Sequence, residues 1–198
     1  MKRILLLSIT VILSLFFTTS CGFWQGDDSG EKASHTFYGV VVEERYEDID
    51  FATIYVFIPG TGAVALPSLE GGEAPQISSG NLVRLYFENV GEMYLLESYP
   101  AMFGIAATEI EVNDTDVSLE YKDGVYYYTS PCQEASDFTV GDEVEYESIQ
   151  SSEIRYRGNV TEISDERITV ALSLVDAQAA QNFLSLQMNG ANLIKATK

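Results

Sequence analysis

The chain has few of the residues on which several kinds of chemistry depend. It contains 1 His and 2 Cys among 198 residues, namely His35, Cys21 and Cys132. A conventional zinc site needs three or four nitrogen and sulfur ligands, so this composition excludes one. It also leaves His35 as the single imidazole that could act as a base for a Ser or Cys nucleophile. The sequence therefore predicts no metal, no cofactor and no catalytic residue.

Basic residues are also scarce. The chain has 11 Lys and Arg against 30 Asp and Glu, which gives a formal charge of −19. Nucleic-acid phosphates need Lys and Arg to displace their counterions, so we expect no nucleic-acid partner. The acidity favours solubility, cationic partners or loose binding of divalent cations, and does not choose among them. With 46% hydrophobic residues the chain can bury a core of one domain or two small ones.

The N-terminus has the three parts of a secretory signal. Lys2 and Arg3 give a positive start, Ile4 to Phe17 form an almost unbroken apolar run, and small residues lead to Cys21. The apolar run is too short for a comfortable bilayer span. Cleavage before Cys21 would remove two basic residues and no acid, leaving 9 basic residues against 30 acids and a formal charge of −21. The pattern predicts a strongly acidic exported protein.

The end of this signal, Thr18-Thr19-Ser20-Cys21, resembles the lipobox of bacterial lipoproteins. Members of that class carry diacylglycerol on the thiol of the cysteine that becomes the first mature residue. Ser20 has the small side chain that the peptidase needs, although Thr18 stands where the family usually has Leu. The resemblance implies that residues 1–21 are a signal peptide ending at a lipidated Cys21. It also implies a membrane partner through the lipid anchor, at the outer face of the cytoplasmic membrane.

The alternative is ordinary cleavage after Ser20, because Thr18 and Ser20 are small enough for that enzyme too. Cys21 would then be a free thiol or pair with Cys132, since an oxidising exterior permits disulfides. If Cys21 carries lipid, Cys132 has no partner.

After a polar tether over residues 22–35, the chain has a β texture. Residues 36–44 and 53–59 predict a long hairpin, and residues 82–88 alternate apolar and polar side chains as a half-buried strand does. Three short motifs then follow in order: Gly80-Asn81-Leu82-Val83, Glu97-Ser98-Tyr99-Pro100-Ala101 and Glu109-Ile110-Glu111-Val112. They resemble a small OB-like β-barrel domain of unknown function from secreted and lipid-anchored proteins of Gram-positive bacteria. The resemblance covers residues 36–112 and implies a barrel and a cell-surface setting, but no reaction.

Residues 113–198 predict a second β-rich unit. Asp123-Gly124 supplies the positive backbone angles of a tight hairpin, and residues 143–149, 154–163 and 167–174 alternate as strands. A helix is expected over about 176–189, capped by Asp176 and stopped by Asn189-Gly190. The order of motifs weakly repeats that of the first unit. We therefore expect a mainly β fold of OB-like β-barrels with one C-terminal helix, either as two related halves or as one continuous barrel or sandwich.

Three groups of residues were weighed for chemistry. His35 and Cys132 would be needed for a sortase-like site, but Cys132 lies in a loop context and His35 at the end of the tether, so a non-catalytic cysteine is the preferred interpretation. An acidic turn resembles the start of a calcium loop, yet Leu119 stands where the turn glycine must be, so a solvated turn is preferred. No pair of acids is singled out for glycoside hydrolysis. The turn consists of Asn113, Asp114, Asp116 and Glu120.

The remaining candidates are Tyr126 and Tyr128, which alternation places on one face of a strand. Their rings could stack on a sugar or a protein partner, or they could simply belong to the core, where tyrosines suit a half-buried pleated surface. The sequence thus predicts a lipid-anchored, non-catalytic binding or envelope-associated module with an unknown protein or glycan partner. The alternative is a small cell-surface enzyme of hydrolase or transpeptidase type with an unidentified active site.

Overall fold

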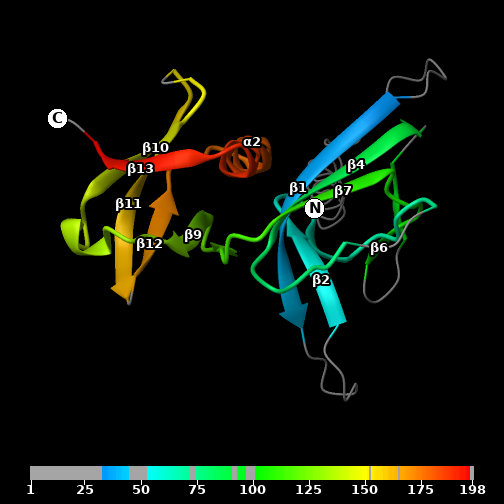
Figure 1. Cartoon of the computed structure of the whole chain (residues 1–198), viewed down its shortest axis with the longest axis horizontal. Helices are drawn as coiled ribbons and strands as arrows, with labels where there is room; N and C mark the ends of the chain where they lie inside the picture. Colours follow the sequence, from blue (N-terminus) through cyan, green and yellow to red (C-terminus); the bar gives the residue numbers. More distant parts are fainter. Residues whose placement is uncertain are drawn as a thin grey trace, which may run out of the picture.

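The computed structural model describes residues 33–44, 53–71, 75–90, 93–96, 101–151, 153–164 and 166–196. These residues form two mainly antiparallel sheets with one α-helix, α2 (Ala177–Met188), lying between them (Figure 1). The predicted mainly β fold with a helix near the C-terminus is therefore confirmed. In the ranges just given, no helix has the length and apolar character needed to cross a membrane.

The first sheet has the strand order β5-β6-β3-β2-β1-β4-β7. The predicted hairpin is confirmed as the antiparallel pair of β1 and β2, in which Val40 lies opposite Phe57. β1 begins at Ala33, so His35 belongs to this strand and not to the tether expected over residues 22–35. The strands are β1 (Ala33–Glu44), β2 (Thr53–Ile58), β3 (Gly62–Ala65), β4 (Leu82–Val90), β5 (Leu95–Leu96), β6 (Met102–Phe103) and β7 (Glu109–Asn113).

The second sheet has the order β13-β10-β11-β12-β9-β8. The tight hairpin is confirmed, because Asp123 and Gly124 have φ angles of 53° and 84° between β8 and β9. A 3₁₀ turn, η1 (Ala135–Asp137), lies between β9 and β10. The strands are β8 (Ser118–Lys122), β9 (Val125–Pro131), β10 (Glu143–Ser148), β11 (Arg155–Ser164), β12 (Arg167–Leu172) and β13 (Ala191–Lys195).

The two sheets do not share one pairing scheme. In the first, β4 pairs with β1 of the hairpin and with β7. In the second, β10 pairs with β11 and β13, while the hairpin strand β9 pairs with β12. The weak repeat in the sequence is therefore not accompanied by a repeated strand order in the described residues.

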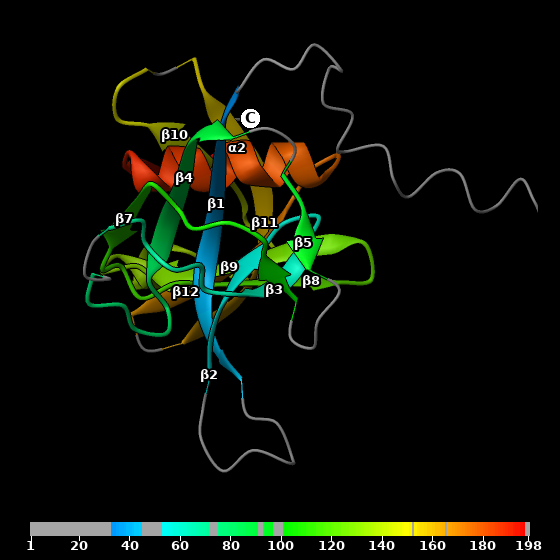
Figure 2. The same cartoon turned by 90° about the vertical axis from the view of Figure 1, so that its right-hand side faces the viewer.

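The core of the second sheet is built around α2. Phe183 is fully buried, and its ring centroid lies 4.9 Å from that of Tyr128 and 5.1 Å from that of Tyr146. The same cluster includes Val40 and Leu82 from the first sheet, so α2 packs against both sheets. Figure 2 shows the helix crossing behind β1 and β4. A second cluster, around Val83, Leu85, Phe87 and their neighbours, fills the other face of the first sheet.

Gln181 fastens α2 to the backbone of β1. Its Oε1 accepts a hydrogen bond from the amide of Tyr38 at 2.8 Å, and its Nε2 donates to the carbonyl of Tyr38 at 2.7 Å. The register that places Val40 opposite Phe57 would put Pro59 opposite Tyr38, and proline has no N–H to donate. The buried amide of Gln181 therefore satisfies two backbone groups that β2 leaves unpaired.

Replacing Gln181 should consequently destabilise the protein. We expect Gln181→Leu to lower the free energy of unfolding by about 2–3 kcal/mol, because the half-buried amide and carbonyl of Tyr38 lose their partners. Gln178→Leu on the exposed side of the same helix is the matched control and should change the free energy by less than about 0.5 kcal/mol. Guanidinium unfolding followed by circular dichroism measures both, and equal values would contradict the role of Gln181.

Candidate binding site at the junction of the two sheets

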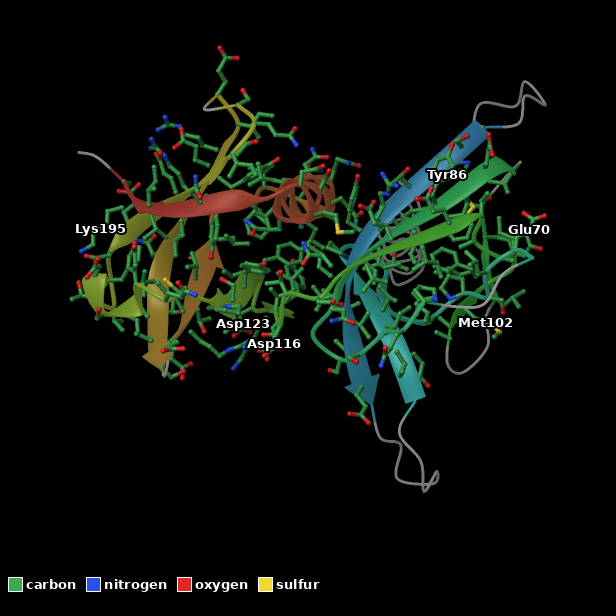
Figure 3. All side chains as sticks on the ribbon, viewed as in Figure 1. Glu70, Tyr86, Met102, Asp116, Asp123 and Lys195 are labelled. Atoms are coloured by element: carbon green, nitrogen blue, oxygen red, sulfur yellow. The ribbon has the colours of Figure 1, made fainter. Side chains whose placement is uncertain are left out.

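A pocket of about 450 Å³ opens where the two sheets meet beside the first turn of α2. The first sheet contributes Phe57 and the β2–β3 turn over residues 60–62, the second contributes the β8–β9 hairpin, and residues 174–177 lead into the helix. Figure 3 shows Asp123, at the tip of the hairpin, on the side of the second sheet that faces the first. Pockets that hold small ligands commonly have volumes of roughly 300–1,000 Å³, so this one is large enough for such a ligand. We call it the junction pocket.

The turn between β2 and β3 is shaped by glycine. Gly60 has a φ of 84°, and a Cβ added to it would lie 2.7 Å from the Cβ of Ala177. Only glycine adopts this backbone angle without strain and allows the turn to approach the helix so closely. The β2–β3 turn therefore packs closely against the Ala177 side chain at the start of α2, and both residues line the junction pocket.

Two tyrosines form the aromatic side of the junction pocket. Tyr121 and Tyr126 lie opposite each other across the hairpin, with ring centroids 4.5 Å apart and an interplanar angle of 40°. Tyr126 is 6% exposed, whereas Tyr121 is 56% exposed. The buried ring fixes the position of its neighbour, and the exposed ring can offer its face to a ligand.

A carboxylate stands beside these rings. Oδ1 of Asp176 accepts a hydrogen bond from the amide of Ala179 at 2.7 Å and caps α2. Its Oδ2 has no hydrogen-bond partner among the described residues. Burial raises the pKa of the Tyr126 phenol, and the nearby Tyr121 and Asp176 raise it further. The junction pocket thus combines aromatic surface with a negative charge whose second oxygen is available.

The structure places the two predicted tyrosines differently. Tyr126 lines the junction pocket, but Tyr128 is 1% exposed and packs edge-on against Tyr146 and Phe183. Burial also raises the pKa of the Tyr128 phenol far above its usual range. A ring enclosed in this way cannot offer its face to a ligand, so Tyr128 is removed from the candidate site. Tyr121 takes its place in the candidate site. This residue could have been found from the sequence, because the two-residue Asp123-Gly124 turn sets the hairpin register and places Tyr121 opposite Tyr126.

His35 and Cys132 lie in different sheets. His35 is on β1, opposite Phe87 of β4, and Cys132 follows β9, where its amide donates to the carbonyl of Glu166. No hydrogen bond joins the two side chains in the described parts of the chain. Burial raises the pKa of the Cys132 thiol, which lowers its thiolate fraction. This arrangement gives no support to a nucleophilic Cys and His pair.

Two residues of the acidic turn after β7 already form hydrogen bonds or ion pairs with nearby residues. Oδ1 of Asn113 accepts hydrogen bonds from the amide and the hydroxyl of Thr115, and Asp116 forms an ion pair with Arg167. In the described residues, no group of three or more His, Cys, Asp or Glu side chains is arranged to hold a metal ion. The preference for a solvated turn over a calcium loop stays a prediction.

Most Lys and Arg side chains of the two sheets form ion pairs with Asp or Glu. Glu145 is 4% exposed because Arg155 and Arg157 cover it from the neighbouring strand, each with a contact of 2.8 to 2.9 Å. The hydrogen bond from Lys195 lowers the pKa of Asp142 to about 2. The remaining ion pairs among the described residues are Arg84 with Glu109 and Glu111, and Arg155 with Glu147.

Several sequence predictions fall outside the described residues. These are the signal peptide with Cys21, most of the tether, and residues 97–100 of the second quoted motif. Comparison of the chain with models of protein families, with curated proteins and with solved structures finds no match. The resemblances to bacterial lipoproteins and to the OB-like domain are therefore supported by their quoted residues alone.

Proposed function

We propose that the protein is a lipid-anchored, extracytoplasmic binding module that holds its ligand in the junction pocket and catalyses no reaction. The observation that carries this proposal is a pocket of about 450 Å³ that is bordered by an exposed tyrosine and a carboxylate. Its lining includes Thr61, Asp176 and two tyrosines but no Ser, Cys, His or Lys, so it lacks the Ser–His or Cys–His pair of a conventional nucleophilic site. Its chemistry therefore suits recognition of a ligand better than attack on one.

The anchor in this proposal is diacylglycerol on Cys21. It is supported by the positive start at Lys2 and Arg3, the short apolar run and the small residues before the cysteine. An acidic body gains little attraction from anionic lipid, so a covalent lipid is the physical means by which such a protein would stay at the membrane. The protein would then present the junction pocket on the outer face of the cytoplasmic membrane.

For the first unit we propose an OB-like arrangement over residues 36–112. An antiparallel run of β3, β2, β1, β4 and β7 supports it. A parallel bridge between Leu69 and Ala107 also supports it, because it brings the chain after β3 beside the chain before β7. This bridge would bring the two ends of the sheet together in the way that a small barrel requires.

The binding role is tested with the mature protein, labelled with ¹³C at the tyrosine rings and kept in a non-ionic detergent. Three probes of similar shape are added in turn: benzylammonium, benzyl alcohol and phenylacetate. We expect at least one of them to shift the ring signals of Tyr121 and Tyr126 in a saturable way. Tyr94 is the internal control, because it is 51% exposed and does not line the junction pocket. If none of the probes shifts Tyr121 more than Tyr94, the proposed site is wrong.

A further inference from the structure

The lining of the junction pocket also indicates the chemical class of its ligand. We infer that the junction pocket binds an organic cation, with an ammonium group held between the Tyr121 ring and the Asp176 carboxylate. This inference rests on the proposed function and adds the charge and the shape of the ligand. A free molecule and the side chain of a partner protein can both present this group to the pocket.

Aromatic rings favour a positive charge at this place. The face of a tyrosine ring carries negative electron density and attracts an ammonium group within about 6 Å of its centroid. Tyr121 is 56% exposed, and its contact with Tyr126 holds the ring against the hairpin. A neutral apolar ligand would use the same area but would gain nothing from this attraction.

The formal charges nearby also favour a cation, because the full negative charge of Asp176 outweighs the partial positive charge at the N-terminus of α2. Asp176 borders the junction pocket, and one of its oxygens accepts no hydrogen bond from the described residues. Asp123 lies at the tip of the hairpin. Lys122 is the basic residue nearest in sequence to Tyr121, and strand alternation puts it on the opposite face of β8. The net charge of −19 adds a long-range field that concentrates cations and repels anions.

The size and the apolar lining exclude a bare metal ion as the best occupant. Phe57 and Leu174 add apolar surface to the volume of about 450 Å³. A metal ion would need several oxygen ligands, and no such group exists among the described acids. An ammonium group with an organic body fits both the charge and the apolar walls.

The test compares choline with its neutral analogue of nearly the same shape, 3,3-dimethylbutan-1-ol, by titration of the full mature protein in non-ionic detergent. We expect choline to bind at least about ten-fold more tightly, and its affinity to fall as the salt concentration rises. Asp176→Asn keeps the helix cap, because asparagine caps as well as aspartate, but removes the charge. Tyr121→Leu removes the ring and keeps an apolar side chain.

Each variant should weaken choline binding by about three-fold to ten-fold and leave binding of the neutral analogue nearly unchanged. Tyr94→Leu, a change at a similarly exposed tyrosine away from the junction pocket, should have no effect. Equal affinities for choline and its neutral analogue, or an Asp176→Asn variant that binds choline as wild type does, would overturn the cation inference. In that event, a shift of the Tyr121 ring signal with benzyl alcohol would still support the proposed function. If no probe shifts this signal, both the proposed function and the cation inference are wrong.

The source of the cation is resolved by a second comparison. The lysine derivative Nα-acetyl-lysine methylamide presents the group as a partner's side chain would. Tighter binding of this compound than of choline indicates a protein partner, and tighter binding of choline indicates a free molecule. Either order supports the inference, and failure of both compounds to bind contradicts it.

Discussion

Phe183→Ala should lower the free energy of unfolding by about 3–5 kcal/mol, the usual cost of removing a fully buried phenylalanine. The side chain has no exposed surface, and its ring meets those of Tyr128, Tyr146 and Tyr156 at centroid distances of 4.9, 5.1 and 5.6 Å. Alanine would leave a cavity bordered by three large rings that are themselves held in strands. The loss is therefore expected near the upper end of the range.

Guanidinium unfolding monitored by circular dichroism and by tyrosine fluorescence measures this effect. Asn182→Ala, on the exposed side of the same helix, is the control and should change the free energy by less than about 0.5 kcal/mol. Because α2 also touches Val40 and Leu82 of the first sheet, the two sheets should lose structure in one transition. A loss below about 1 kcal/mol for Phe183→Ala would show that α2 does not pack on the second sheet as described.

Cys21→Ser should release the protein from the membrane and abolish its lipid label. Each buried methylene of an acyl chain contributes about 0.8 kcal/mol to membrane binding, so two chains hold a protein firmly and their loss removes nearly all attachment. Ser20 suits the ordinary signal peptidase as well, so we expect the variant to be cleaved and recovered in the soluble fraction.

Labelling of growing cells with radioactive palmitate, followed by fractionation, measures both effects together. Cys132→Ser is the matched control and should keep the label and the location of wild type, since its thiol is far along the chain from the signal. Recovery of the wild-type protein from the medium with an unmodified N-terminal mass would contradict the anchor.

Local chemistry predicted much of the second sheet correctly. Asp123-Gly124 gave the hairpin, Asp176 and Asn189 gave the limits of α2, and period two placed Val144 and Tyr146 inside. These features depend on neighbouring residues, so they can be inferred without knowing the tertiary structure. The alternation of side chains along β9 also correctly placed Tyr126 and Tyr128 on the same face of the strand.

Features that depend on distant contacts could not be predicted. The sequence allowed a core position for Tyr128 but could not choose between it and an exposed one, because the burial of this ring depends on α2, about 50 residues later in the chain. Glu145 lies on the outer face, as alternation requires, yet it is buried because the register of β11 brings two arginines over it. The junction pocket unites Gly60, Tyr121 and Asp176, which no sequence motif connects.

The central claim is that the junction pocket holds a ligand while the protein is in place on the cell. It is tested most directly by placing the photo-reactive residue p-benzoylphenylalanine at position 121 in living cells, with position 94 as the control. Irradiated protein is recovered and read on a gel for a macromolecular partner and by intact mass for a small one. We predict one dominant adduct from position 121 that is absent from position 94. No adduct from position 121, or the same adducts from both positions, would contradict the account.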